Sequence, residues 1–94
     1  MAAGDAFFVY VAPAAGQNVS FQPVSGTTFL ITWAVTSNYV KIQLTDGTNV
    51  VDIIGSSVST RTERIFISNS CYPVFVYTAT TGSGSGYIGG VQIK

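Results

Sequence analysis

Short runs of alternating apolar and polar residues fill most of this 94-residue chain, and turn residues (Gly, Pro, Asn, Ser) separate each run from the next. A period of two is the pattern of β-strands, and no segment shows the three- and four-residue spacing of an amphipathic helix. The runs are also rich in β-branched and aromatic residues, which favour strands. The sequence therefore predicts one all-β domain over residues 1–94, a single antiparallel β-sandwich of about eight short strands.

Two kinds of β-sandwich fit this pattern. The first and last runs are both strongly apolar, which favours a jelly roll, because its terminal strands pair near one edge. An immunoglobulin-like sandwich is the alternative, although its Cys…Trp…Cys signature is missing. Residues 1–5 are expected to form a flexible N-terminal arm. The predicted strands are Ala6–Ala12, Gln17–Gln22, Thr27–Val35, the two arms of a hairpin over Asn38–Ile54, Thr60–Ser68, Cys71–Ala79 and Tyr87–Lys94.

The clearest local signal is the hairpin, because Asp46-Gly47 lies between two alternating runs. Asp-Gly is typical of a two-residue type I′ turn, whose length also sets the strand register. In that register Thr45 lies opposite Thr48, and Lys41 lies opposite Asp52 as a stabilising charge pair. One hairpin face is then predicted to be core and the other a mixed face, half-buried against a neighbouring subunit. The core face would carry Val40, Ile42, Leu44, Val51 and Ile53, and the mixed face Tyr39, Val50 and Ile54 beside Gln43 and the charge pair.

Other segments give more local predictions. Period-two spacing in Thr27–Val35 puts Trp33 on the same side as Phe29 and Ile31, so Trp33 is expected in the core. Asn69-Ser70 is a plausible two-residue turn that would place Arg64 opposite Phe75 in a cation–π contact. The Gly82–Gly86 segment is interpreted as a flexible loop, and Gly89-Gly90 indicates a bulge or a close backbone approach. The Gly82–Gly86 segment is not a phosphate-binding loop, because no Gly-Lys-Ser/Thr follows it.

Charge is unusually sparse. Charged residues make up 9% of the chain, with four basic and four acidic side chains and no histidine. Four scattered cations form no basic patch, which argues against nucleic-acid binding. The N-terminus has no secretory-signal pattern, and no apolar run is long enough to span a bilayer. We therefore expect a protein that is made in the cytosol, is not exported by a signal peptide and does not enter a membrane.

Nothing in the sequence indicates catalysis. Cys71 has no histidine to activate it, and a single cysteine excludes an internal disulfide framework. The four acids are not spaced as a paired-carboxylate site or as a cluster of metal ligands. We expect no enzyme activity, no catalytic residue, no cofactor and no metal site. The acids are Asp5, Asp46, Asp52 and Glu63.

A surface with so little charge offers little protection against association. An oligomer that hides much of its surface is favoured over a monomer with a Ser/Thr-rich exterior, because Ala6–Ala12 and Cys71–Ala79 are apolar on both faces. The second hypothesis is a carbohydrate-binding or adhesin-like module that stacks sugars on exposed tyrosines, and a third is an immunoglobulin-like accessory domain. The predicted subunit-interface residues are Phe8, Tyr10, Tyr39, Val50, Ile54, Tyr72, Phe75 and Tyr77.

Over its whole length the chain resembles the small all-β virion proteins of tailed bacteriophages, of the decoration, cement or fibre type. The resemblance rests on the Met-Ala-Ala-Gly start, the charge-poor composition, the Asp46-Gly47 hairpin and the Thr-Gly-Ser-Gly-Ser-Gly-Tyr-Ile-Gly-Gly-Val-Gln-Ile-Lys ending. It implies a non-enzymatic homo-oligomer, a trimer in the favoured case, located in the virion and bound to capsid or fibre proteins. Binding to the assembled particle and not to its parts would stabilise the particle by mass action.

Overall fold

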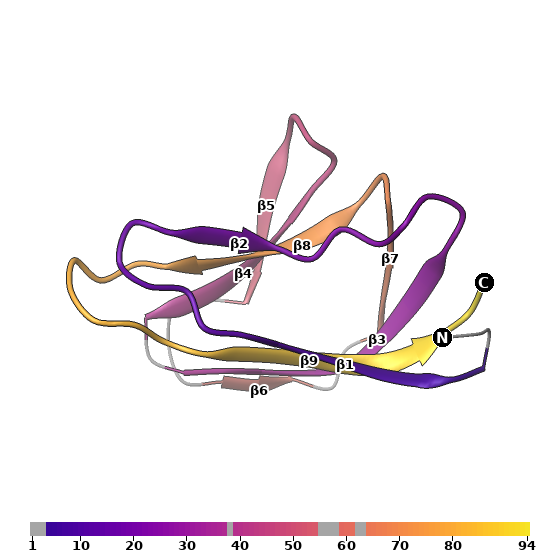
Figure 1. Ribbon diagram of the computed structural model, residues 1–94, viewed down its shortest axis with the longest axis horizontal. Helices are drawn as coiled ribbons and strands as arrows, with labels where there is room; N and C mark the ends of the chain where they lie inside the picture. Colours follow the sequence, from indigo (N-terminus) through magenta and orange to yellow (C-terminus); the bar gives the residue numbers. More distant parts are fainter. Residues whose placement is uncertain (1–3, 38, 55–58, 62–63) are drawn as a thin grey trace.

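The computed structural model describes residues 4–37, 39–54, 59–61 and 64–94, and these residues form two antiparallel sheets that face each other (Figure 1). The fold is all-β, as predicted, and the described residues contain no helix. One sheet has the order β1-β9-β3-β6, with β7 also paired to β3, and the other has the order β2-β8-β4-β5. The strands are β1 (Ala6–Val11), β2 (Asn18–Ser20), β3 (Thr28–Thr36), β4 (Val40–Thr45), β5 (Val50–Ile54), β6 (Ser59–Arg61), β7 (Ile65–Ser68), β8 (Tyr72–Tyr77) and β9 (Gly86–Gln92).

The strands pair in a nested order. The first strand pairs with the last (β1–β9), β2 pairs with β8, β3 pairs with β6 and β7, and β4 pairs with β5. Because β6 and β7 follow one another along the same side of β3, they occupy one position in the sheet. This is a jelly roll, the favoured prediction. An immunoglobulin fold would instead put its first and last strands in different sheets.

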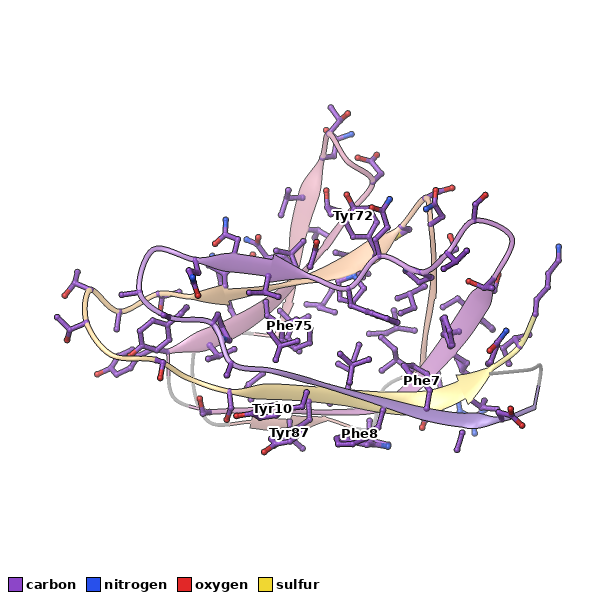
Figure 2. The ribbon with its side chains drawn as sticks, in the orientation of Figure 1. Phe7, Phe8, Tyr10, Tyr72, Phe75 and Tyr87 are labelled. Atoms are coloured by element: carbon purple, nitrogen blue, oxygen red, sulfur yellow. The ribbon has the colours of Figure 1, made fainter. Side chains whose placement is uncertain are left out.

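The core lies between the two sheets and is built by alternation along each strand. In β1, Phe7 and Val11 are buried while Phe8 and Tyr10 point outward. Figure 2 shows Phe7 and Phe75 inside the sandwich and Phe8 and Tyr10 outside it. The prediction that both faces of this strand are covered is therefore wrong within a single chain. The buried apolar residues are Phe7, Val11, Phe29, Ile31, Ala34, Val40, Ile42, Ile67, Phe75, Tyr77 and Ile88.

A β-bulge in β3 overturns the predicted position of Trp33. The pairing with β9 passes from Ile31 opposite Gly90 to Trp33 opposite Gly89, so Thr32 is an extra residue. An extra residue exchanges the two faces of a strand from that point on. Before the bulge Ile31 is buried, and after it Ala34 is buried, whereas Trp33 lies half-buried on the outer face.

The β4–β5 hairpin is present, but its turn and register differ from the prediction. Thr45 pairs with Val50, so the loop has four residues, and Gly47 alone among them has a positive φ, of 96°. A type I′ turn would need a positive φ at both of its central residues. The longer loop shifts the pairing by two residues in total, which preserves the faces, so Leu44 lies opposite Val51. The loop projects beyond the sandwich (Figure 1).

That projection divides the predicted core face of the hairpin. Val40 and Ile42 are fully buried, as expected, and Leu44 and Ile53 are half-buried. Val51 is 59% exposed, so its assignment to the core is wrong.

The Asn69-Ser70 turn has the two-residue form that was predicted. Ser68 and Cys71 exchange backbone hydrogen bonds of 2.8 and 3.3 Å across it. The strands then separate, because β7 pairs with β3 in one sheet while β8 pairs with β2 and β4 in the other. The expected Arg64–Phe75 contact is therefore wrong, since Phe75 is completely buried opposite Val19 and Ile42.

The glycine-rich segment before β9 is held in place, contrary to its interpretation as a flexible loop. The Gly84 N–H donates to the Pro13 carbonyl (3.1 Å), and the Ser85 N–H donates to Ser37 Oγ (2.8 Å). A Cβ at Gly84 would overlap the Val40 side chain, so glycine is needed for this close approach.

Part of the predicted N-terminal arm is also attached. The Gly4 N–H donates to the Gln92 carbonyl (2.7 Å), and the Gln92 N–H donates to the Asp5 carbonyl (2.9 Å). Residues 1–3 lie outside the described residues.

Candidate functional site

A row of aromatic rings crosses the outer face of the β1-β9-β3 sheet. Phe8 and Tyr10 come from β1, Tyr87 from β9 and Trp33 from β3. The Phe8 ring stacks beside Trp33 (centroids 6.3 Å, interplanar angle 26°) and beside Tyr87 (6.2 Å, 8°). Tyr10 and Tyr87 lie directly opposite each other, with centroids 4.8 Å apart. Figure 2 shows Phe8, Tyr10 and Tyr87 together, pointing away from the other sheet.

The strand register explains why these rings meet. Gly89 pairs with Phe8 on one side and with Trp33 on the other. A Cβ at Gly89 would overlap the Trp33 indole, so the missing side chain leaves the space in which this indole and Phe8 lie close together. The Gly89-Gly90 signal thus marks a close approach, as predicted. A Cβ at Gly90 would overlap the backbone carbonyl of Leu30, opposite the β3 bulge.

We call this outer surface the aromatic face. Phe8 is 62% exposed, Tyr10 is 53% exposed and Phe66 is 63% exposed. None of its members carries a charge or a side-chain amide. Scattered exposed apolar residues are ordinary, but a continuous set of this kind marks an interaction site in a soluble protein. The aromatic face consists of the four ring residues Phe8, Tyr10, Trp33 and Tyr87 with their outward-facing cross-strand neighbours Ala6, Leu30, Val35, Phe66 and Val91.

The predicted interface residues do not form one surface. Phe8 and Tyr10 belong to the aromatic face, whereas Tyr39 (49% exposed) and Val50 (56% exposed) are exposed in the β4–β5 region. Tyr39 has a positive φ of 67°, and its ring and the Tyr77 ring are almost perpendicular, with centroids 6.4 Å apart. Tyr72 is half-buried. The two remaining β8 residues, Phe75 and Tyr77, are core residues (0% and 9% exposed) and offer no surface to a second subunit, while the Ile54 side chain lies outside the described residues.

Trp33, Tyr87 and Phe66 belong to the aromatic face but were not among the predicted interface residues. The prediction for Trp33 is wrong because the bulge between Ile31 and Trp33 interrupts the alternation of β3. The Gly89-Gly90 pair is the sequence signal that could have corrected this, because paired glycines mark a bulge or a bulky neighbour across the ladder.

The β4–β5 hairpin forms a second, shallow concavity lined by Leu44, Thr45, Asp46, Asn49, Val50, Val51 and Cys71. The one carboxylate in this lining, that of Asp46, accepts hydrogen bonds from its own loop. Asp46 Oδ1 accepts hydrogen bonds from the backbone N–H of Asn49 (2.7 Å) and of Thr48 (2.9 Å). These N–H donors, Asn49 first, lower the pKa of Asp46 below its usual value of 3.8. The Asp46 carboxylate therefore organises the turn.

Within the described parts of the chain, no three His, Cys, Asp or Glu side chains gather where a metal ion could bind. The same residues include no helix long and apolar enough to cross a membrane. Among the described residues, the aromatic face is thus the feature that most clearly indicates a function.

No protein-family model matches the chain, and no curated protein matches it.

Proposed function

We propose that this is a non-enzymatic structural protein that acts by assembly, as a decoration or fibre-type component of a viral particle. The observation that supports an assembly role is the aromatic face. Apolar, charge-free surface is characteristic of contacts between subunits, which are more apolar than ordinary protein surface. The virion setting comes from the phage-protein resemblance of the chain, and the jelly roll is a fold that viral capsid proteins and lectins both use.

The physical basis is removal of aromatic surface from water. Each aromatic side chain in a contact can bury roughly 150–250 Å² and adds a preference for ring stacking. Phe8 and Tyr10 are both more than half exposed in the single chain, so a partner that covers them would remove a large apolar area from water. A partner that covers them would bind the folded chain and not the unfolded chain. Such binding would therefore stabilise the jelly roll as well as the assembly.

A carbohydrate-binding module is the second candidate, and the ring row favours it. Phe8 and Tyr87 are almost parallel, as rings that stack a sugar would be. Sugar sites also need polar groups that hydrogen-bond to the hydroxyls. The polar side-chain groups of the aromatic face are the two tyrosine hydroxyls and the Trp33 indole N–H, a small number beside its apolar side chains, which favours the protein–protein contact.

The mass of the protein in solution tests the proposal. We expect sedimentation equilibrium to give a homo-oligomer at micromolar concentration, and the doubly substituted Phe8→Ser/Tyr10→Ser variant to be a monomer. Val24→Ser is the matched control, because Val24 is 75% exposed but lies outside the aromatic face. This control should assemble like the original protein.

A monomeric wild-type protein would contradict assembly through self-association. If such a monomer changed its Trp33 and tyrosine fluorescence on titration with glycans, the sugar-binding module would take its place. Genes for capsid or tail proteins beside this gene would support the virion setting.

A further inference from the structure

The edges of the two sheets differ sharply in how they are protected from pairing with another chain. Exposed strand edges offer free N–H and C=O groups, and proteins commonly guard them with charges, bulges or short strands. β2 has only three residues. β5 carries Asp52, whose side chain is 60% exposed, and a register irregularity opposite Ile42 and Gln43. At the other edge of the β1 sheet, β6 has three residues and β7 has four.

β1 lacks all of these protections. Its six residues, Ala-Phe-Phe-Val-Tyr-Val, include no charge, no proline and no glycine, and they pair in regular register with β9. Six-residue segments of high β-propensity and no charge are those most prone to pair with other strands. Within the described residues, no strand covers the other side of β1.

The hydrogen-bond pattern shows which backbone groups of β1 face the open edge. The Gln92 N–H donates to the Asp5 carbonyl, and these two residues come directly before the pair Ala6–Val91, with which the β1–β9 register begins. In an antiparallel ladder, hydrogen-bonded pairs alternate with non-bonded pairs. Phe7, Val9 and Val11 therefore bond to β9. The N–H and C=O groups of Ala6, Phe8 and Tyr10 point to the open edge.

We propose that β1 pairs with β1 of a second copy of this chain, antiparallel, with the two-fold axis at Phe8. Phe8 would lie opposite Phe8 of the second copy, and Ala6 opposite Tyr10 of that copy. This register joins edge-facing residues on both sides, as a hydrogen-bonded ladder requires. The inference rests on the proposed assembly role and specifies the contact between two copies.

A second copy fits this edge for two reasons. The first reason is charge. β1 has no charged side chain and the chain has no net charge, so no like charges meet across the axis. The second reason is that directly opposed residues point to the same face of the sheet. On the outer face, the two aromatic faces would become one continuous surface. On the inner face, Phe7 of the second copy would cover the half-buried Val9. The symmetry is two-fold, so the basic unit is a dimer and not the trimer implied by the phage-protein resemblance.

Cysteine cross-linking tests the register. In a Cys71→Ser background, Phe8→Cys would place two thiols across the axis with Cα atoms about 5.5 Å apart, within the range of a disulfide. We expect mild oxidation to convert most of this variant to a covalent dimer. Phe66→Cys is the matched control, because Phe66 has the same exposure on the same face but lies at the opposite edge of the sheet, in β7. Equal cross-linking of the two variants would overturn the proposed contact.

Charge substitution separates this inference from the proposed function. Phe8→Lys would oppose two ammonium groups at the axis, and we expect the dimer dissociation constant to rise roughly tenfold or more. Val24→Lys is the control that should leave the constant within about twofold, because Val24 is 75% exposed and lies outside the aromatic face. Phe66→Lys, on the aromatic face but away from β1, should weaken the dimer much less than Phe8→Lys. Equal weakening by Phe8→Lys and Phe66→Lys would show that copies meet through the aromatic face and not the β1 edge, which overturns the inference but keeps the assembly role. A wild-type monomer would overturn both, and a wild-type trimer would overturn the two-fold pairing.

Discussion

Gln43 and Asp52 lie directly opposite each other in the β4–β5 hairpin, and Gln43 Nε2 donates a 2.7 Å hydrogen bond to Asp52 Oδ1. Lys41 Nζ approaches the same carboxylate oxygen from a diagonal position, at 3.7 Å. The sequence predicted the Lys41–Asp52 ion pair, but as a directly opposed pair. Because the loop has four residues and not two, the register is shifted by two residues, so Gln43 and not Lys41 lies opposite Asp52.

Two double-mutant cycles on the hairpin would measure these contacts separately. The Lys41–Asp52 cycle, with alanine at each position, should give a coupling of roughly 0.2–1 kcal/mol, because the carboxylate is well exposed to solvent. This coupling should fall towards zero in about 1 M NaCl, where charges are screened within a few ångströms. The Gln43–Asp52 coupling should fall less, since the Gln43 amide is neutral. Urea unfolding of the single and double variants provides the measurement, and a salt-insensitive lysine coupling would contradict the assignment.

The Asp46 carboxylate predicts a pH dependence for the turn. Its pKa in the folded chain lies below the usual value of 3.8 because the N–H groups of Asn49 and Thr48 bond to the charged form. A depressed carboxyl pKa contributes stability that is fully present above pH 3.8 and is lost as the pH falls below that value. Asp46→Asn keeps an oxygen acceptor but removes the titration, so its unfolding free energy should vary less with pH in that acid range. Urea unfolding between neutral and acid pH tests this, and parallel pH profiles for the two proteins would contradict it.

The sequence predicted the fold class because alternation and turn residues are local signals that each act within a few positions. It did not predict where alternation breaks. A single inserted residue, Thr32, turns Trp33 from the core to the surface, and only pairing with Gly89 and Gly90 on a distant strand reveals it. The hairpin shows the same limit, because the Asp46 side-chain hydrogen bonds compete with the preference of Asp-Gly for a type I′ turn.

The aromatic face was only half predictable for a related reason. Phe8 and Tyr10 are part of it because they alternate with Phe7 and Val11 along one strand, which the sequence displays. Tyr87 and Trp33 join them through pairing between strands far apart in the chain. Phe75 and Tyr77 were assigned to an interface because their strand is apolar, but β8 lies inside its sheet between β2 and β4. Composition alone does not distinguish a core strand from an interface strand.

Phe75 and Phe66 offer a direct comparison between core and surface. Phe75 is completely buried between the sheets, so Phe75→Ala should lower the unfolding free energy by about 3–5 kcal/mol. Phe66 is 63% exposed, and Phe66→Ala should change the free energy by no more than roughly 0.5 kcal/mol. Chemical denaturation at one protein concentration checks both values. Similar losses for the two variants would show that Phe66 is also covered, as it would be if an assembly contact involved β7.

Gly89 and Gly90 should differ in whether a second substitution can relieve an added methyl group. At Gly90 the Cβ would overlap the Leu30 backbone carbonyl, which cannot move without breaking the β3–β9 ladder, so Gly90→Ala should cost roughly 3 kcal/mol. At Gly89 the Cβ would overlap the Trp33 indole, a side chain that can be replaced. Gly89→Ala should cost roughly 1–3 kcal/mol, and adding Trp33→Val should recover part of that loss as a favourable coupling of at least about 0.5 kcal/mol. The same Trp33→Val change should not recover Gly90→Ala, because the indole is not what the Gly90 methyl group meets. Thermal and urea unfolding of the three single and two double variants measures both couplings, and equal recovery at the two glycines would contradict the bulge geometry that places Trp33 on the aromatic face.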